Sequence, residues 1–252
     1  VVRCFEDPDV QHVDDTVNPL RDIETIDLEL IAADAAVVSG AMDKAKKLAR
    51  TGDKAATLRL EALQACEAVL SELQPVRSVE LDPVAERELR SFALLTAKPV
   101  LYVANVDEDD VAGQSPAVQQ VRDHAAQHGG NVVAFCAKIE AELMELDEAD
   151  RQEMLESLDM SEPALHVVAR AAYQLLGQQS FFTAGPKEIR AWTIDLGSTA
   201  PQAAGAIHSD IERGFIRAET VAYDQLVERG SMVEARKHGE VRLEGKQYEV
   251  QD

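Results

Sequence analysis

The sequence has few cysteines, few aromatic side chains and too few basic residues to balance its acidic ones. Its three cysteines, Cys4, Cys66 and Cys136, stand far apart, which argues against a disulfide framework and a CxxC zinc site. A net charge of −21 disfavours binding to duplex DNA or to an anionic membrane, because both need a clustered positive field. No apolar run approaches the roughly 18 residues of a membrane span, and no signal segment opens the sequence. We therefore expect a cytoplasmic protein without structural zinc.

The 252 residues that are present have a globular composition, with 46% hydrophobic and 28% charged residues. At roughly 150 residues per domain, this length predicts one to two domains. Acidic residues concentrate before residue 180, and the segment after it has short apolar runs with glycine and proline between them. This change predicts a domain boundary near Gly177. Residues 1–5 and 246–252 both resemble interrupted strands, so we expect the chain to be part of a larger protein.

Residues 23–96 are expected to form a helical insertion. Apolar residues recur there at helical spacing in two series, which are joined by the turn Thr51-Gly52-Asp53. The first series is Ile23, Ile26, Leu30, Val37, Met42 and Leu48, and the second is Ala62, Cys66, Val69 and Leu73. Two such helices are predicted to pack as an antiparallel hairpin that ends near Pro75. A coiled-coil-like spacer without chemistry of its own is the simplest interpretation.

After the insertion, the spacing of apolar residues changes from a helical to a strand-like pattern. Residues 98–105 and 131–136 are short apolar runs rich in β-branched residues, and the stretch around Pro116 reads as a crossover helix. This pattern predicts a βαβ unit of a parallel sheet. Ligands of such sheets bind at the carboxyl ends of the strands, where this sequence carries Asn-Val-Asp-Glu at 105–108 and Cys-Ala-Lys at 136–138.

These two polar tails follow the order of base recognition in P-loop nucleotidases. The guanine-specific pattern is Asn-Lys-x-Asp after one strand and Ser-Ala-Lys after the next, and its Asp accepts hydrogen bonds from guanine. Asn105 matches the first position, whereas Glu108 replaces Asp and moves the carboxylate outward by one methylene. Adenine has no 2-amino group to meet a carboxylate, so we expect guanine preference to be lost. The predicted base-binding residues are Asn105, Val106, Glu108, Cys136, Ala137 and Lys138.

The sequence resembles the Obg-like ATPases, the YchF family, over essentially its whole length. The resemblance rests on residues 3–7, 105–108, 136–142, 181–193 and 207–219, of which the segments around Trp192 and Phe215 are highly specific. It implies an α/β fold in which a P-loop nucleotidase sheet is interrupted by an antiparallel helical hairpin and followed by a β-grasp TGS domain. The implied domains are a nucleotide-binding domain from residues 1–22 and 97–177, the insertion at 23–96, and the TGS domain at 178–252.

The resemblance also implies a ribosome-associated hydrolase that prefers ATP over GTP and uses Mg²⁺. The sequence departs from the family pattern. A phosphate loop of the form G-x-x-x-x-G-K-[ST], a switch Thr and an upstream D-x-x-G do not occur in order, and Cys136 stands where the family usually has Ser. Asp110-Val111-Ala112-Gly113 matches D-x-x-G only by letter and is expected to be a loop. Without a phosphate loop these residues should not hydrolyse ATP alone, and the Mg²⁺ ligands are expected outside them. No catalytic residue and no metal ligand is therefore predicted within this sequence.

Other candidate residues have a structural and a functional interpretation. Four basic residues near Trp192 and Phe215 are candidates for an RNA or ribosome contact, and the alternative is that they only solvate a β-grasp core: Lys187, Arg190, Arg213 and Arg217. His12, His124, His128 and His166 are interpreted as scattered surface or core residues without a carboxylate at ligand spacing. The acidic run at 140–156 is expected to be the solvated face of one helix. The alternative to a hydrolase is a ribosome or RNA interaction module in which nucleotide is dispensable.

Overall fold

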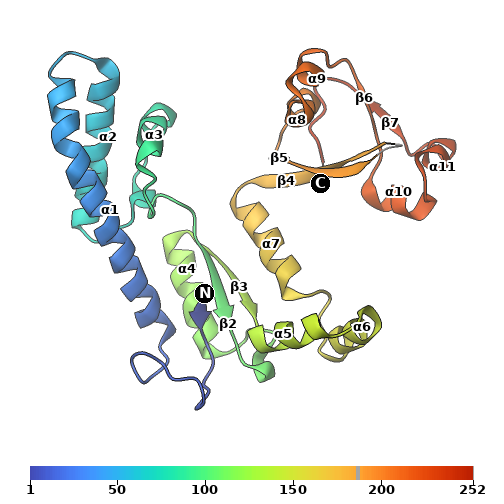
Figure 1. Cartoon of the computed structure of the whole chain (residues 1–252), viewed down its shortest axis with the longest axis horizontal. Helices are drawn as coiled ribbons and strands as arrows, with labels where there is room; N and C mark the ends of the chain where they lie inside the picture. Colours follow the sequence, from blue (N-terminus) through green and yellow to red (C-terminus); the bar gives the residue numbers. More distant parts are fainter. Residues whose placement is uncertain (186–187, 252) are drawn as a thin grey trace. The chain divides into compact units, whose positions relative to one another are not determined.

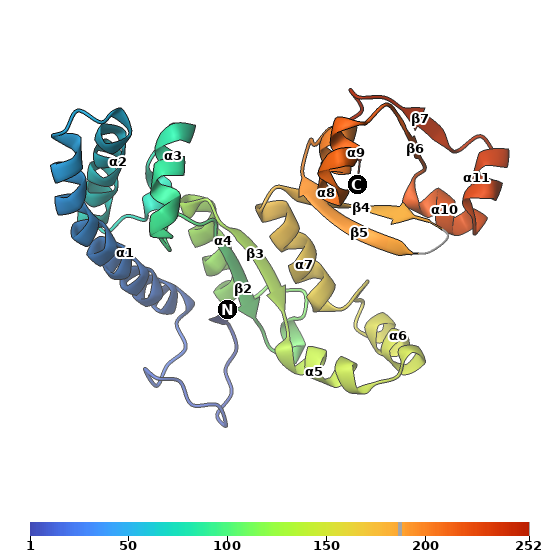
Figure 2. The ribbon, with the colours of Figure 1, turned by 45° about the horizontal axis from the view of Figure 1, so that its top comes forward.

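The computed structural model describes residues 1–185 and 188–251, which divide into two compact units, Val1–Leu175 and Leu176–Asp252. Figure 1 and Figure 2 show each unit as a mixture of helices and strands. The first unit contains a three-stranded sheet and a long helical hairpin. The second contains, in its described residues, two pairs of strands with short helices. Within the described residues, we find no helix with both the length and the apolar character of a membrane span.

The sheet of the first unit is parallel, in the order β1-β2-β3. Its strands are β1 (Val2–Arg3), β2 (Leu101–Asn105) and β3 (Asn131–Phe135). The crossover helix α4 (Pro116–His128) begins at a Ser115 cap and ends at Gly129, which adopts the left-handed conformation that glycine tolerates. Tyr102 and Ala104 alternate into a core that α4 completes, as strand periodicity requires. This is the βαβ unit expected from the change of period.

Three further helices follow the sheet: α5 (Ala137–Glu145), α6 (Glu148–Ser157) and α7 (Ala164–Leu175). The α7 helix packs against β2 and β3, and Figures 1 and 2 show α4 and α7 on opposite sides of β3. The prediction of a single helix over residues 140–156 is wrong. The chain leaves helical geometry at Leu146, and Asp147 caps a new helix through the N–H groups of Ala149 and Asp150.

The helical hairpin consists of α1 (Pro19–Ala49) and α2 (Lys54–Ser71), which lie side by side in both views. Gly52 takes a positive φ in the turn, and the Asp53 carboxylate caps α2. Leu63 and Cys66 are fully buried between the helices, and Val38 is 1% exposed. Burial of these side chains stabilises the hairpin.

The predicted core-facing series of the hairpin is partly wrong. Ile26, Val37, Leu48 and Leu73 are among the exposed hydrophobic residues. The buried stripe is instead formed by Ile31, Val38, Met42 and Ala45 on α1 and by Ala62, Leu63, Cys66 and Leu70 on α2. Apolar residues occupy more than one face of α1, and helical spacing alone does not say which face meets a partner.

A buried carboxylate ties the hairpin to the segment that leads into β2. After α2 the chain runs through η1 (Val76–Ser78), α3 (Pro83–Leu89) and η2 (Arg90–Phe92). Asp34 on α1 is 1% exposed and accepts the N–H groups of Leu95 and Thr96 at 2.8 and 2.7 Å. It also accepts the Thr96 hydroxyl at 2.6 Å, and that hydroxyl oxygen in turn accepts the N–H of Val76. Three segments of the chain therefore meet around Asp34 and Thr96.

The second unit begins with an antiparallel pair, β4 (Gln178–Ala184) and β5 (Ile189–Asp195). The helices α8 (Ala200–Ile207) and α9 (Ser209–Arg213) follow, and β6 (Ala218–Thr220) pairs with β7 (Arg242–Glu244). Between β6 and β7 lie α10 (Tyr223–Arg229) and α11 (Met232–Lys237). Phe215 packs with Ala200 and Ala204 in a small core.

The strand expected at residues 246–252 is not formed in the part of it that the structure describes. Lys246 lies in a turn, and Glu249 makes only an isolated bridge to Thr199. Ala200 N–H instead donates to the carbonyl of Tyr248, and Val250 N–H donates to that of Ser198. Nε2 of Gln179 also donates to the carbonyl of Val250 at 2.9 Å. Alternation of polar and apolar residues does not make a strand without a neighbour that pairs along its length.

Candidate nucleotide-base site

The candidate site lies where β1, β2 and β3 end. Asn105 and Phe135 are in register as the last residues of β2 and β3. The N–H of Cys4 donates to the carbonyl of Asn105 at 2.8 Å, and the N–H of Val106 donates to that of Phe135 at 2.9 Å. The polar tails after β2 and β3 are therefore neighbours at one edge of the sheet, where parallel sheets bind their ligands.

Asn105 joins the two tails directly. Its Oδ1 accepts the N–H of Ala137, the first residue of α5, at 3.0 Å. Because this bond uses the oxygen, the amide nitrogen of Asn105 is the group that remains to donate to a ligand. Ala137 itself is exposed, whereas Val106 and Cys136 are 2% and 4% exposed. Val106 and Cys136 can therefore face a ligand only with their backbone.

Glu108 and Lys138 form an ion pair across the same edge. Glu108 opens the short helix η3 (Glu108–Asp110), and its Oε2 lies 2.6 Å from Nζ of Lys138 on α5. The hydrogen bond and the charge of Glu108 raise the pKa of Lys138 above its usual value. Both side chains are exposed, so the pair is open to solvent and to a ligand. The structure thus brings together the carboxylate and the ammonium group that the sequence places thirty residues apart.

The loop after β2 is fixed by hydrogen bonds from its backbone N–H groups to two aspartate side chains. Asp107 accepts the N–H of Glu108, and Asp110 accepts the N–H groups of Gln114 and Ser115. Burial acts to raise the pKa of Asp110, but hydrogen bonds from Ser115 and Gln114 outweigh it and lower that pKa. Asp110 and its neighbours therefore form a turn that leads into α4, as expected of a stretch that matches D-x-x-G only by letter.

Gly113 allows this loop to lie close to the sheet. It has a φ of +62°, and a Cβ built on it would lie 2.5 Å from Cβ of Ala134 on β3. Only glycine combines this backbone conformation with so close an approach. The carbonyl of Gly113 also accepts a hydrogen bond from Arg122 on α4 at 2.6 Å. The loop that carries Glu108 is thus anchored to both neighbouring elements.

Comparison with known proteins decides the family. The chain is 47% identical over 254 residues to the ribosome-binding ATPase YchF of Bacillus subtilis, a match that covers 100% of the chain and 69% of the relative. The chain belongs to the YchF family. The ribosome-binding ATPase YchF of Escherichia coli O157:H7 is 44% identical, again over 100% of the chain and 69% of the relative.

A family model and a solved structure agree with membership of the YchF family. Residues 178–252 match the model YchF-GTPase_C, described as a protein of unknown function (DUF933). The structure of the Schizosaccharomyces pombe YchF GTPase is similar to the chain with a TM-score of 0.72 and 29% identity. That similarity covers 100% of this chain and 68% of the other, so the mixed α/β architecture is shared along the whole length described.

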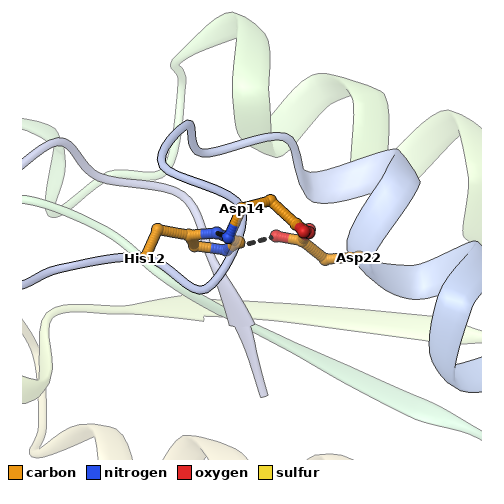
Figure 3. A group of neighbouring side chains, drawn as sticks. All are labelled: His12, Asp14 and Asp22. Atoms are coloured by element: carbon orange, nitrogen blue, oxygen red, sulfur yellow. Dashed lines mark hydrogen bonds and ion pairs between the residues drawn. The ribbon is translucent and has the colours of Figure 1, made fainter.

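One histidine and two aspartates in the loop before α1 and in its first turn do not fit a Mg²⁺ site. Figure 3 shows His12, Asp14 and Asp22, whose ligand atoms lie within 4.8 Å of one another. His12 Nε2 lies 3.0 Å from Asp22, and His12 Nδ1 accepts the N–H of Asp14. The guanidinium of Arg21 already contacts both carboxylates, at 3.0 Å from Asp22 and 3.4 Å from Asp14. Arg21 supplies the positive charge, so this group fastens the preceding loop to α1.

The histidines are scattered as expected, but the interpretation that they have no carboxylate at ligand spacing is wrong. Besides the contact of His12 with Asp22, His124 lies 3.8 Å from Asp27, and His166 lies 3.9 Å from Glu162. The His166 pair has the four-residue spacing of a helical turn, which the sequence could have revealed. The other contacts bridge a loop and a helix, or two helices, and spacing along the chain carries no signal for them.

The described basic candidates of the second unit have different surroundings. Arg190 stacks over the ring of Trp192 at 4.3 Å, and Trp192 donates to the Thr183 hydroxyl at 2.9 Å. Arg213 pairs with Asp210 on its own helix, and Arg217 is exposed. Lys187 lies outside the described residues. Arg190 and Arg217 are thus the two described candidates for which we find no ion pair in residues 1–185 and 188–251.

Proposed function

We propose that the protein is a ribosome-associated nucleotide hydrolase that prefers ATP over GTP and acts in the cytoplasm. The observation that carries the proposal is the meeting of Asn105, Glu108 and Lys138 at the carboxyl edge of the sheet. It combines an amide donor, a carboxylate and a long aliphatic stem with a charged end, which together suit a purine base and its ribose. Both the ribosome-binding ATPases and the GTPase to which the chain is similar carry nucleotide hydrolysis in their names.

In this proposal, the residues described bind the nucleotide base and do not bind or hydrolyse its phosphates. We assign residues 1–22 and 97–177 to a nucleotide-binding domain, 23–96 to the helical insertion and 178–252 to a β-grasp TGS domain. The backbone nest, the lysine for the β- and γ-phosphates and the Mg²⁺ ligands do not occur in order in this sequence. Since the chain spans 69% of its relatives, we propose that a further segment provides them and catalyses hydrolysis.

The proposal is tested by isothermal titration of the full-length translation product, including any residues before Val1, with ATP and with GTP in the presence of Mg²⁺. We expect the dissociation constant for ATP to be lower than that for GTP. Equal or reversed affinities would contradict the assignment of Glu108 as the residue that removes guanine preference. No binding of either nucleotide would instead favour the interaction module.

The second unit offers a separate prediction for the ribosome contact. Arg190 on its aromatic partner Trp192 and the exposed Arg217 suit RNA, whose phosphates and bases attract guanidinium groups. We expect Arg190→Glu and Arg217→Glu each to weaken co-sedimentation with ribosomes, and added salt to weaken the wild-type interaction.

Lys98→Glu is the matched control for these variants, because it reverses one exposed charge in the first unit. It should sediment as the wild type does. If the Arg190 and Arg217 variants sediment unchanged at low salt, the contact lies elsewhere, and the helical hairpin becomes the candidate to test.

A further inference from the structure

The base of the helical hairpin meets α4 at one buried histidine. His124 lies on α4, its side chain is 10% exposed, and its Nε2 is 3.8 Å from Oδ2 of Asp27 on α1. This distance is too long for a hydrogen bond. Nε2 is buried without a hydrogen-bond partner in the described part of the chain. The contact between α1 and α4 therefore holds an imidazole nitrogen next to a carboxylate without joining them.

The ring of His124 is held by its neighbours rather than by a polar partner. Tyr102 on β2 meets it edge-on, with ring centroids 5.6 Å apart. His128, one turn along α4, stacks on it at 4.2 Å and donates its Nδ1–H to the carbonyl of His124 at 2.9 Å. Aromatic contacts of this kind tolerate a neutral imidazole. A charge added to the buried ring would have the Asp27 carboxylate 3.8 Å away but no hydrogen bond to it in the described part of the chain.

A cavity of about 490 Å³ opens beside the ring. Asp27 lines it from α1, Arg77 and Thr96 line it from the segment after the hairpin, and His124 and His128 line it from α4. The Nε of Arg77 is also buried and unpartnered in the described part of the chain. The space gives the His124 ring somewhere to move, and its polar lining can solvate the ring once it has moved.

Charged and titratable groups face His124 from four elements. They are Glu24 and Asp27 on α1, Arg77 on η1, Asp123 and His128 on α4, and Tyr102 on β2. Burial is the main reason that the pKa of His124 lies below its usual value of 6.5, and the charges of His128 and Arg77 act in the same direction. Asp27 and Glu24 oppose this shift without overcoming it.

We propose that this contact is a proton-sensitive joint, in which neutral His124 keeps the base of α1 docked on α4 and protonation releases it. In the released state His124 is hydrated and binds a proton more readily than in the docked state. Docking is therefore complete above about pH 6.5 and is lost progressively as the pH falls below it. The joint would set the position of the hairpin on the sheet-bearing part of the first unit.

Hydrogen–deuterium exchange of the 252-residue chain tests the joint at about pH 7.5 and about pH 5.5. After correction for the intrinsic rate at each pH, we expect protection of residues 19–30 to fall by about two- to tenfold at the lower pH. Protection of the β2 and β3 amides should change less, because the sheet does not depend on the joint. Equal protection of residues 19–30 at both pH values would overturn the proposal.

Variants separate His124 from other groups that titrate in this range. His124→Gln should remove the pH dependence, whereas Asp27→Asn should enlarge it, because Asp27 favours the protonated ring in the docked state. His166→Gln, which removes an exposed histidine on α7, is the matched control and should keep the wild-type response. Retention of that response in His124→Gln would assign it to another group.

Titration of the His124 ring by nuclear magnetic resonance uses the wild type only, so it tests the proposal even if a variant fails to fold. The His124 ring should titrate below 6.5, with a midpoint that coincides with the loss of protection in residues 19–30. A His124 midpoint at or above that value, or one that does not coincide with the loss of protection, would overturn the joint.

Discussion

Asp34→Ala is expected to lower the free energy of unfolding of the first unit by about 3–5 kcal/mol. The substitution removes the acceptor of two backbone N–H groups and one hydroxyl, those of Leu95 and Thr96. The two donors of Thr96 are buried and the N–H of Leu95 is partly buried, so the Thr96 groups lose their partner without gaining water. The segment that leads from the hairpin into β2 should loosen first.

Urea unfolding followed by far-ultraviolet circular dichroism measures this effect. Asp43→Ala is the matched control, because Asp43 lies on the same helix and is exposed. Its free energy of unfolding should stay within about 0.5 kcal/mol of the wild type. If the two variants unfold at the same urea concentration, Asp34 does not hold the hairpin to the segment before β2.

The parallel sheet could be predicted because its signals are local. The runs that became β2 and β3 are short, apolar and β-branched, and Ser115 and Gly129 mark the ends of the helix between them. Two strands joined by a crossover helix lie parallel, which places Asn105 and Cys136 at the same edge. The neighbourhood of the candidate base site thus followed from the order of elements alone.

The hydrogen bonds and ion pairs between elements could not be predicted, because nothing in the sequence shows which residue each side chain will contact. Asp34 stands among apolar residues of α1, and its acceptor role depends on Leu95 and Thr96, which reach it only after the chain has folded back. The network of His12, Asp22 and Arg21 likewise closes between a loop and a helix. Helical spacing also failed to choose between the faces of α1, since Val37 and Val38 are equally apolar and only Val38 is buried.

The ion pair of Glu108 with Lys138 was not predicted, and it sharpens the expectation for base choice. At 2.6 Å the carboxylate of Glu108 is already held by the ammonium group of Lys138. Because this ion pair holds the Glu108 carboxylate against Lys138 on α5, we expect it not to take the position from which an Asp accepts two hydrogen bonds from guanine. Shortening the side chain by one methylene should break this contact and return the carboxylate toward the base.

Glu108→Asp in the full-length translation product is therefore expected to raise GTP affinity relative to ATP by about 1–3 kcal/mol if the new pair with guanine forms fully. Val106 stands where the guanine-specific pattern has Lys, which limits full restoration. Glu142→Asp makes the same chemical change at an exposed position of α5 and should leave the ratio of affinities unchanged.

Asn105→Ala distinguishes weaker binding of both nucleotides from a change in the preference for one of them. It removes the amide donor and the acceptor of the Ala137 N–H, so both ATP and GTP should bind more weakly while their ratio stays the same. Competitive binding of the two nucleotides to wild type and to each variant measures all three effects. An unchanged ratio in Glu108→Asp, or a wild type that already prefers GTP, would show that this edge of the sheet does not select the base.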